Sequence, residues 1–110
     1  MIIEEWKSQI KRGTLEYCVL LLIARKSCYG YEIMSELSKF SVVAAKESTI
    51  YPLLRRLEKN GILCSYWSET LEGLPPRKYY SLTSTGETYI HQISAEWENL
   101  IAAVNYMKEV

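Results

Sequence analysis

Polar side chains with hydrogen-bonding chemistry gather on one side of a helix predicted over residues 48–63. At 100° per residue, Ser48, Arg55 and Lys59 fall on the same side, with Tyr51 next to them. Hydroxyl, phenol and ammonium groups donate to oxygen acceptors, and a guanidinium can donate to two acceptors at once. This set is suited to binding an oxygen-rich, negatively charged surface rather than to breaking covalent bonds.

The same helix has an apolar face, and both of its ends can be predicted. Gly61 is expected to end the helix, and Pro52 is expected in its first turn, where proline loses no hydrogen bond. A helix with one apolar and one basic face fits a DNA major groove, but a solvated surface helix has the same pattern. The apolar residues follow i, i+3, i+4, i+7 spacing: Ile50, Leu53, Leu54 and Leu57.

The charge of the chain is unevenly distributed. Its 110 residues have a formal net charge of zero, which argues against a strongly basic nucleic-acid binder. Residues 46–80 nevertheless have six basic and four acidic side chains, whereas residues 81–110 have one basic and four acidic. The middle segment could therefore face phosphate while the last segment faces away from it.

Catalytic and metal-binding patterns are missing from the sequence. It has no Asp, no nucleophile–base pair and no glycine-rich phosphate loop, and His91 has no neighbouring Cys or second His. We expect no enzyme activity, metal or cofactor. The spacing of Cys18, Cys28 and Cys64 favours buried thiols in a reducing cytoplasm, with redox sensing as the alternative. The longest apolar run, residues 18–24, is too short to cross a bilayer, so a cytoplasmic location is expected.

The elements around the basic helix predict an α+β fold. A short helix over residues 3–10 is expected to stop at residues 11–13, and Thr14 is expected to begin a second helix. Ser27 is expected to cap a third helix, over residues 29–40, before the basic one.

After Gly61 the pattern changes to that of β-strands. Strands over residues 62–67 and 77–82, joined by a loop at residues 71–76, make a hairpin. Three helices followed by a hairpin is the order of a winged helix-turn-helix, in which the basic helix is the recognition helix and the loop is the wing.

A long C-terminal helix follows, with Thr83 or Ser84 as its cap and a capping box to Glu87. An a/d seam along it is expected to pack on a partner chain and on the N-terminal helix with Ile3, Trp6 and Ile10. The seam comprises Ile90, Ile93, Trp97, Leu100, Val104 and Met107.

Five motifs in order resemble the PadR family of bacterial transcriptional regulators. They are Gly13-Thr14-Leu15-Glu16, Tyr29-Gly30-Tyr31-Glu32-Ile33, residues 48–58, Gly61-Ile62-Leu63, and residues 76–83 with Gly86. The short C-terminal helix resembles the small subfamily that includes multidrug-sensing members.

The resemblance implies a homodimeric repressor that binds operator DNA, with a winged helix-turn-helix domain at residues 1–83 and a dimerisation helix at residues 84–110. The N-terminal helix, residues 2–12, would join the dimer interface. A planar aromatic or cationic effector would bind at Trp97, which otherwise serves as a dimer-core residue.

Individual DNA contacts follow from helix polarity and charge. Ser48, Tyr51 and Arg55 are expected near base edges, since the N-terminal part of a recognition helix reaches deepest into the groove. Phosphate contacts are expected from Arg56, Lys59, Arg77 and Lys78, and the DNA-facing surface also includes Thr49 and Pro52. The wing sequence Glu72-Gly73-Leu74-Pro75-Pro76 has no cation of its own. The alternative hypothesis is a winged-helix protein–protein interaction module without sequence-specific DNA binding.

Overall fold

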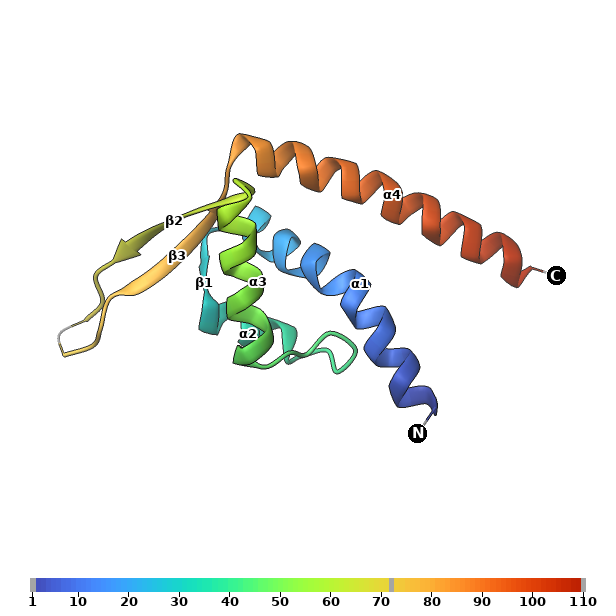
Figure 1. The fold of residues 1–110 in the computed structure, drawn as a ribbon, viewed down its shortest axis with the longest axis horizontal. Helices are drawn as coiled ribbons and strands as arrows, with labels where there is room; N and C mark the ends of the chain where they lie inside the picture. The colour runs from blue at the N-terminus through green and yellow to red at the C-terminus, as the bar shows by residue number, and fades with distance from the viewer. Residues whose placement is uncertain (1, 72, 110) are drawn as a thin grey trace.

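The computed structural model describes residues 2–71 and 73–109, which form four helices and a three-stranded sheet (Figure 1). The elements are α1 (Ile2–Arg25), β1 (Cys28–Tyr29), α2 (Gly30–Leu37), α3 (Glu47–Lys59), β2 (Leu63–Ser68), β3 (Arg77–Leu82) and α4 (Ser84–Lys108). This order confirms the predicted winged helix-turn-helix with an additional C-terminal helix.

The N-terminal helix is longer than the sequence indicates. The predicted break at residues 11–13 is wrong, because α1 runs without interruption from Ile2 to Arg25. Thr14 does not cap a new helix: its hydroxyl donates to the Ile10 carbonyl at 2.9 Å, a bond made inside a continuous helix. One glycine costs a helix only about 1 kcal/mol, which the buried second half of α1 can offset.

The core lies where α1, α2, α3 and the hairpin meet. The predicted apolar face of α3 is fully inside it, and Ile50 and Leu54 have no exposed surface. From α1 the core receives Leu15, Val19, Leu20 and Ile23. The buried half of α1 is therefore the support on which the recognition helix rests.

The second helix and the proline of α3 differ from prediction. α2 ends at Leu37 rather than Phe40, and its N-cap is Tyr29, so Ser27 does not cap it. The Ser27 hydroxyl bonds the Ser81 hydroxyl instead. Pro52 lies in the second turn of α3, because the helix begins at Glu47 with Lys46 as N-cap. The Ser48 carbonyl therefore lacks its usual helical N–H partner.

The sheet has the order β1-β3-β2, with both pairs antiparallel. In the hairpin, Trp67 pairs with Lys78 and Ser65 pairs with Tyr80, as predicted for two strands joined by a long loop. β1 was not predicted. Its two residues, Cys28 and Tyr29, are a strand only through their pairing with Tyr80 and Tyr79.

The hairpin passes into α4 with Thr83 as the only residue between them. Its hydroxyl oxygen accepts a hydrogen bond from the Gly86 N–H at 3.0 Å, so Thr83 is the N-cap and the predicted Ser84 capping box is wrong. The Thr83 N–H donates to the Ile62 carbonyl at 3.1 Å. A side chain at position 86 would overlap that same carbonyl oxygen. The start of α4 is thus joined directly to the end of the recognition helix.

Candidate nucleic-acid interface

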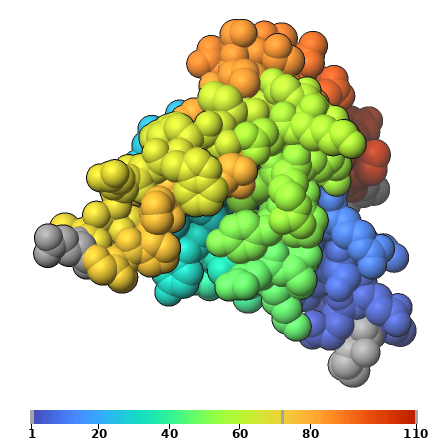
Figure 2. All heavy atoms as spheres, turned by 60° about the vertical axis from the view of Figure 1, so that its left-hand side comes forward, coloured from blue at the N-terminus to red at the C-terminus, as the bar shows by residue number. Residues whose placement is uncertain are grey.

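The polar face of α3 is open to solvent, between the hairpin and the N-terminal half of α1 (Figure 2). The exposed residues here include Ser48, Thr49, Pro52, Arg55 and Lys59. In the described part of the chain, Arg55 and Lys59 take part in no ion pair. Their charges are therefore available to a polyanion, as the sequence predicts.

Tyr51 is held more firmly than a simple surface residue. Its ring packs on Gly30 at the start of α2, so closely that a Cβ atom at position 30 would meet the ring. Burial, and secondarily the Glu47 carboxylate, raises the pKa of the Tyr51 hydroxyl, which therefore stays protonated as a hydrogen-bond donor. Gly30 thus fixes the direction of this ring on the α3 surface.

A groove of about 440 Å³ separates α3 from the hairpin. Tyr51 and Arg55 line one side, and Trp67, Arg77 and Lys78 line the other. Trp67 is 68% exposed. Trp67 was not predicted to belong to this surface, although strand alternation places it on the same hairpin face as Lys78, its cross-strand partner.

Two of the predicted phosphate contacts are bound to carboxylates. Arg56 Nη2 lies 2.9 Å from Glu16 Oε1 of α1, and Lys78 Nζ lies 3.3 Å from Glu58 Oε1 of α3. These partners lie far from the cations in the sequence, so local patterns could not reveal them. The four predicted phosphate contacts therefore differ: Lys59 is unpaired among the described residues, whereas Arg56 and Lys78 already have an anionic partner.

Glu58 also receives a hydrogen bond from the hydroxyl of Ser65 in β2. This hydrogen bond, followed by the contact with Lys78, lowers the pKa of the Glu58 carboxyl. Glu58 consequently connects both strands of the hairpin to the recognition helix.

Three tyrosine rings pack together on the sheet face that carries Tyr79, and Tyr29 also reaches the groove beside Arg77. Tyr79 lies between Tyr29 and Tyr66, with ring centroids 5.3 and 5.7 Å away. The Arg77 guanidinium lies 4.5 Å from the centroid of the Tyr29 ring. The hairpin tyrosines thus serve packing, and Arg77 is oriented by a cation–π contact.

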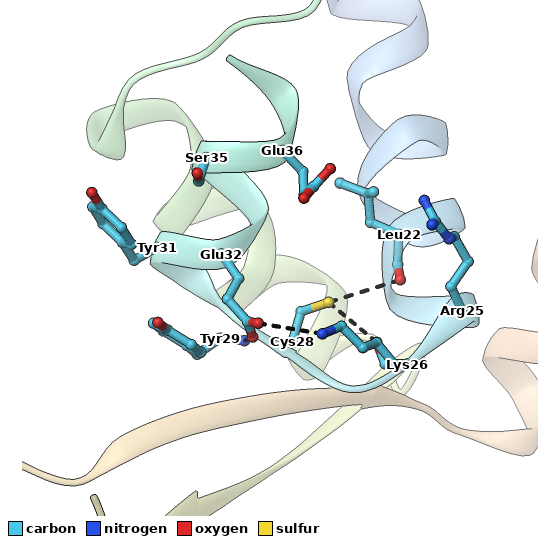
Figure 3. Close-up of a pocket in the computed structure, with 9 residues that line it drawn as sticks. All are labelled: Leu22, Arg25, Lys26, Cys28, Tyr29, Tyr31, Glu32, Ser35 and Glu36. Atoms are coloured by element: carbon cyan, nitrogen blue, oxygen red, sulfur yellow. Dashed lines mark hydrogen bonds and ion pairs between the residues drawn. The ribbon is translucent and has the colours of Figure 1, made fainter. Parts of the chain in front are cut away.

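A second cavity, of about 380 Å³, lies between the end of α1 and α2 (Figure 3). Lys26 and Glu32 form an ion pair across it, with 3.6 Å between Nζ and Oε2. The Cys28 thiol faces the Lys26 carbonyl at 3.2 Å, and burial raises its pKa. A raised pKa leaves little reactive thiolate, which argues against redox sensing here.

The three cysteines are unequal in burial. Cys28 is buried and Cys18 is half-buried, but Cys64 is exposed on the hairpin, so the expectation of buried thiols is wrong for Cys64. Among residues 2–71 and 73–109, no cluster of three or more potential metal ligands occurs. None of the helices in these ranges is both long and apolar enough to span a membrane.

Residues 19–92 match the family model described as the transcriptional regulator PadR-like family. This chain belongs to the PadR family. A PadR family transcriptional regulator from Eggerthella lenta is similar in structure, with a TM-score of 0.86 and 34% identity over 99% of this chain and 94% of that one. A PadR-like regulator from Bacillus cereus has a TM-score of 0.81 and 32% identity over 90% and 95%.

Two curated proteins are also similar in sequence. A protein of Lysinibacillus sphaericus is 35% identical over 94% of this chain and 95% of its own length. The negative transcriptional regulator PadR of Bacillus subtilis is 34% identical over 82 residues, which are 70% of this chain but only 43% of that regulator.

Membership of the PadR family makes this protein a DNA-binding transcriptional regulator and not an enzyme. It thereby favours the DNA-binding hypothesis over the protein-interaction module. The exposed polar face of α3 is the surface of this PadR-like domain whose shape and charge suit that role.

Proposed function

We propose that this PadR-family protein is a homodimeric repressor, with α3 of each copy in the major groove of operator DNA. One observation carries the dimer: the outer ends of α1 and α4 are apolar and uncovered. Trp6 is 54% exposed, Leu100 is 54% exposed and Met107 is 68% exposed. Ile3, Ile10 and Val104 are exposed as well. Large apolar side chains grouped in this way indicate a protein partner.

The geometry of the two helices supports a second copy as that partner. The outer ends of α1 and α4 extend from the same side of the winged-helix domain (Figure 1). In two copies related by a twofold axis, the seam residues of α4 could meet the N-terminal part of the other copy's α1. In this proposal residues 1–83 are the DNA-binding domain and residues 84–110 are the dimerisation helix.

The oligomeric state tests the proposal directly. Wild-type protein is expected to sediment as a dimer at micromolar concentration, and Leu100→Glu is expected to sediment as a monomer, because it places a charge in the seam. Ala102→Glu is the matched control, since position 102 lies 200° around the helix from position 100. A monomeric wild type, or a dimer that tolerates Leu100→Glu, would contradict the proposal.

Operator binding should reflect the same symmetry. A twofold dimer requires two half-sites one helical turn apart, about 34–36 Å from centre to centre. We propose that Ser48, Tyr51 and Arg55 face the bases and that Arg56, Lys59, Arg77 and Lys78 face phosphates. Thr49 and Pro52 complete the DNA-facing surface. Footprinting on a selected operator should therefore give two protected half-sites, and a single protected site would contradict the dimer.

Repression is supported by the relative from Bacillus subtilis, which is a negative regulator by name. A reporter placed behind the selected operator should be less active when the protein is present. Increased reporter activity would indicate an activator instead.

The last part of the proposal is an effector site at Trp97. The Trp97 ring is half-buried and lies 5.8 Å from the Tyr17 ring between centroids, at an interplanar angle of 48°. This pair could stack a planar cation or aromatic molecule beside the seam. An acridinium dye should quench the Trp97 fluorescence and release operator DNA, and Trp97→Ala should abolish both responses. Unchanged release in the variant would exclude Trp97 as the site.

A further inference from the structure

Glu16 of α1 binds two different helices with its two carboxylate oxygens. Oε1 accepts a hydrogen bond from Arg56 Nη2 of α3 at 2.9 Å, and Oε2 accepts one from the Tyr89 hydroxyl of α4 at 2.6 Å. The side chain of Glu16 is only 27% exposed, so the carboxylate is well fixed between its partners. The hydrogen bond to Glu16 also raises the pKa of Tyr89, whose hydroxyl therefore keeps donating at neutral pH.

Arg56 retains most of its binding capacity in this arrangement. A guanidinium has five N–H donors, and only a donor on Nη2 is used by Glu16. The side chain is 60% exposed, and it lines a cavity between α1 and α3 together with Thr49 and Pro52 of the proposed DNA-facing surface. The ion pair thus orients the fork of Arg56 and leaves donors for a phosphate.

Tyr89 connects this ion pair to α4. It lies one turn beyond Gly86, where α4 is joined to Ile62, and next to the buried Ile90. The other side-chain contacts between α1 and α4, from Tyr17 to Ser94 and Trp97, do not touch the recognition helix. The hydrogen bond from Tyr89 to Glu16 is thus a polar connection from α4 to the Arg56 side chain of α3, beside the apolar contacts that Ile90 makes in the core.

We propose that Glu16 is a positioning residue for DNA binding: it orients Arg56 toward a phosphate, and Tyr89 fixes Glu16 so that the placement of α4 on α1 sets operator affinity. This inference rests on the proposed docking of α3 in the major groove. It competes with a simpler effect, in which the Glu16 charge only repels DNA. The two hypotheses make opposite predictions for removal of the Glu16 charge. If Glu16 only repels DNA, binding becomes tighter; if Glu16 positions Arg56, binding becomes weaker.

Tyr89→Phe distinguishes the positioning effect from charge repulsion, since it removes one hydroxyl and alters no formal charge. The probe is a labelled duplex enriched by the wild-type protein from a random-sequence pool, with binding followed by fluorescence anisotropy. Tyr89→Phe is expected to weaken binding by roughly fivefold, a typical coupling between sites. Thr88→Val is the matched control, because the Thr88 hydroxyl bonds only its own helix, at the Ser84 carbonyl. It should bind as the wild type does.

Two further variants test the route. Arg56→Gln should lower the salt slope of binding by about one phosphate contact. In that background Tyr89→Phe should have no further effect, because the residue it positions has gone. Glu16→Gln should weaken binding to the selected duplex, although it removes a negative charge near DNA. Its melting temperature, measured alongside, identifies any loss that comes from unfolding.

Tighter specific binding by Glu16→Gln, or unchanged binding by Tyr89→Phe, would overturn the inference. An equal loss from Tyr89→Phe with and without Arg56 would overturn it too, since the effect would then travel by another route. Each of these results requires a wild-type protein that selects a duplex. A wild type that selects none would contradict the proposed function itself.

Discussion

The inner and outer parts of the long helices have the same apolar spacing but opposite surroundings. In the inner part, Leu20 of α1 and Ile90 of α4 are buried by the winged-helix domain. In the outer part, Ile3 of α1 and Leu100 of α4 follow the same periodicity and are exposed. Helical spacing therefore predicts that a stripe will be covered, but not which molecule covers it. The inner stripe is covered by its own chain, and in the proposed dimer the outer stripe is covered by the second copy.

The sharpest way to test this difference is to shorten one leucine in each part. Leu20→Ala removes a side chain with no exposed surface and should lower the free energy of unfolding by about 2–5 kcal/mol at every protein concentration. Leu100→Ala should lower the melting temperature only at concentrations where a dimer forms. Thermal unfolding across a hundredfold range of concentration measures both. A loss in Leu100→Ala that does not depend on concentration would mean that α4 is covered within one chain.

Substitutions of two glycines compare the same inner and outer regions, with smaller expected changes in stability. Gly86→Ala should destabilise the protein by about 1–3 kcal/mol, because the new methyl group overlaps the Ile62 carbonyl oxygen in the backbone. Gly13→Ala, at the base of the outer part of α1, meets no atom within 4 Å and should stabilise the helix by about 0.5–1 kcal/mol. Chemical denaturation of both variants checks the signs. A neutral Gly86→Ala would show that α4 is not fixed at its first turn.

The cations near α3 form a second exposed surface, which in the proposed function is covered by DNA. Arg55 has no ion-pair partner among the described residues. Arg55→Ala should weaken operator binding by about 1–3 kcal/mol and relax the sequence preference at one base position. Lys78→Ala should weaken all DNA sequences about equally and reduce the salt slope, even though Lys78 must share its charge with Glu58. Salt-titrated anisotropy distinguishes the two. Wild-type affinity in Arg55→Ala would remove Arg55 from the groove.

The smallest expected effect concerns the acid side of the stability curve. The pKa of Glu58 is lowered in the folded protein, chiefly by the Ser65 hydrogen bond. Its contribution to the free energy of unfolding is therefore present above the ordinary carboxyl pKa and is lost as the pH falls through the pKa of the folded protein. Glu58→Gln should therefore flatten the fall in unfolding free energy between about pH 5 and pH 3. Glu69→Gln, at an exposed position after β2, is the control. An unchanged slope in Glu58→Gln would mean that the wing is not held by this carboxylate.

Helices and strands that are determined by nearby residues were predictable from the sequence. The apolar face of α3 is buried where the spacing placed it, and both hairpin strands lie within a residue of their predicted ends. The exposed basic side of α3 follows from the same periodicity. Membership of the PadR family was also indicated by local motifs, four of which lie within the matched residues 19–92.

Features that depend on distant partners were not predictable. β1 is defined by its pairing with β3 some fifty residues later in the chain, and Glu16 meets Arg56 forty residues away. Gly13 looked like a helix break because propensity is a weak signal, whereas the packing of Leu15 and Val19 decides the outcome. Pro52 was placed one turn too early for a related reason, since burial of the apolar face of α3 can offset the cost of the missing N–H.

The absence of any spacer between β3 and α4 has a consequence for how operators could diverge. Thr83 ends the hairpin and caps the helix, so the seam is placed relative to α3 by a count of helical residues alone. Each added turn would lengthen this arm by 5.4 Å, and each single residue would swing the seam by 100°. In a dimer built on that seam, half-site separation would change in whole turns of α4, and one-residue insertions would be selected against.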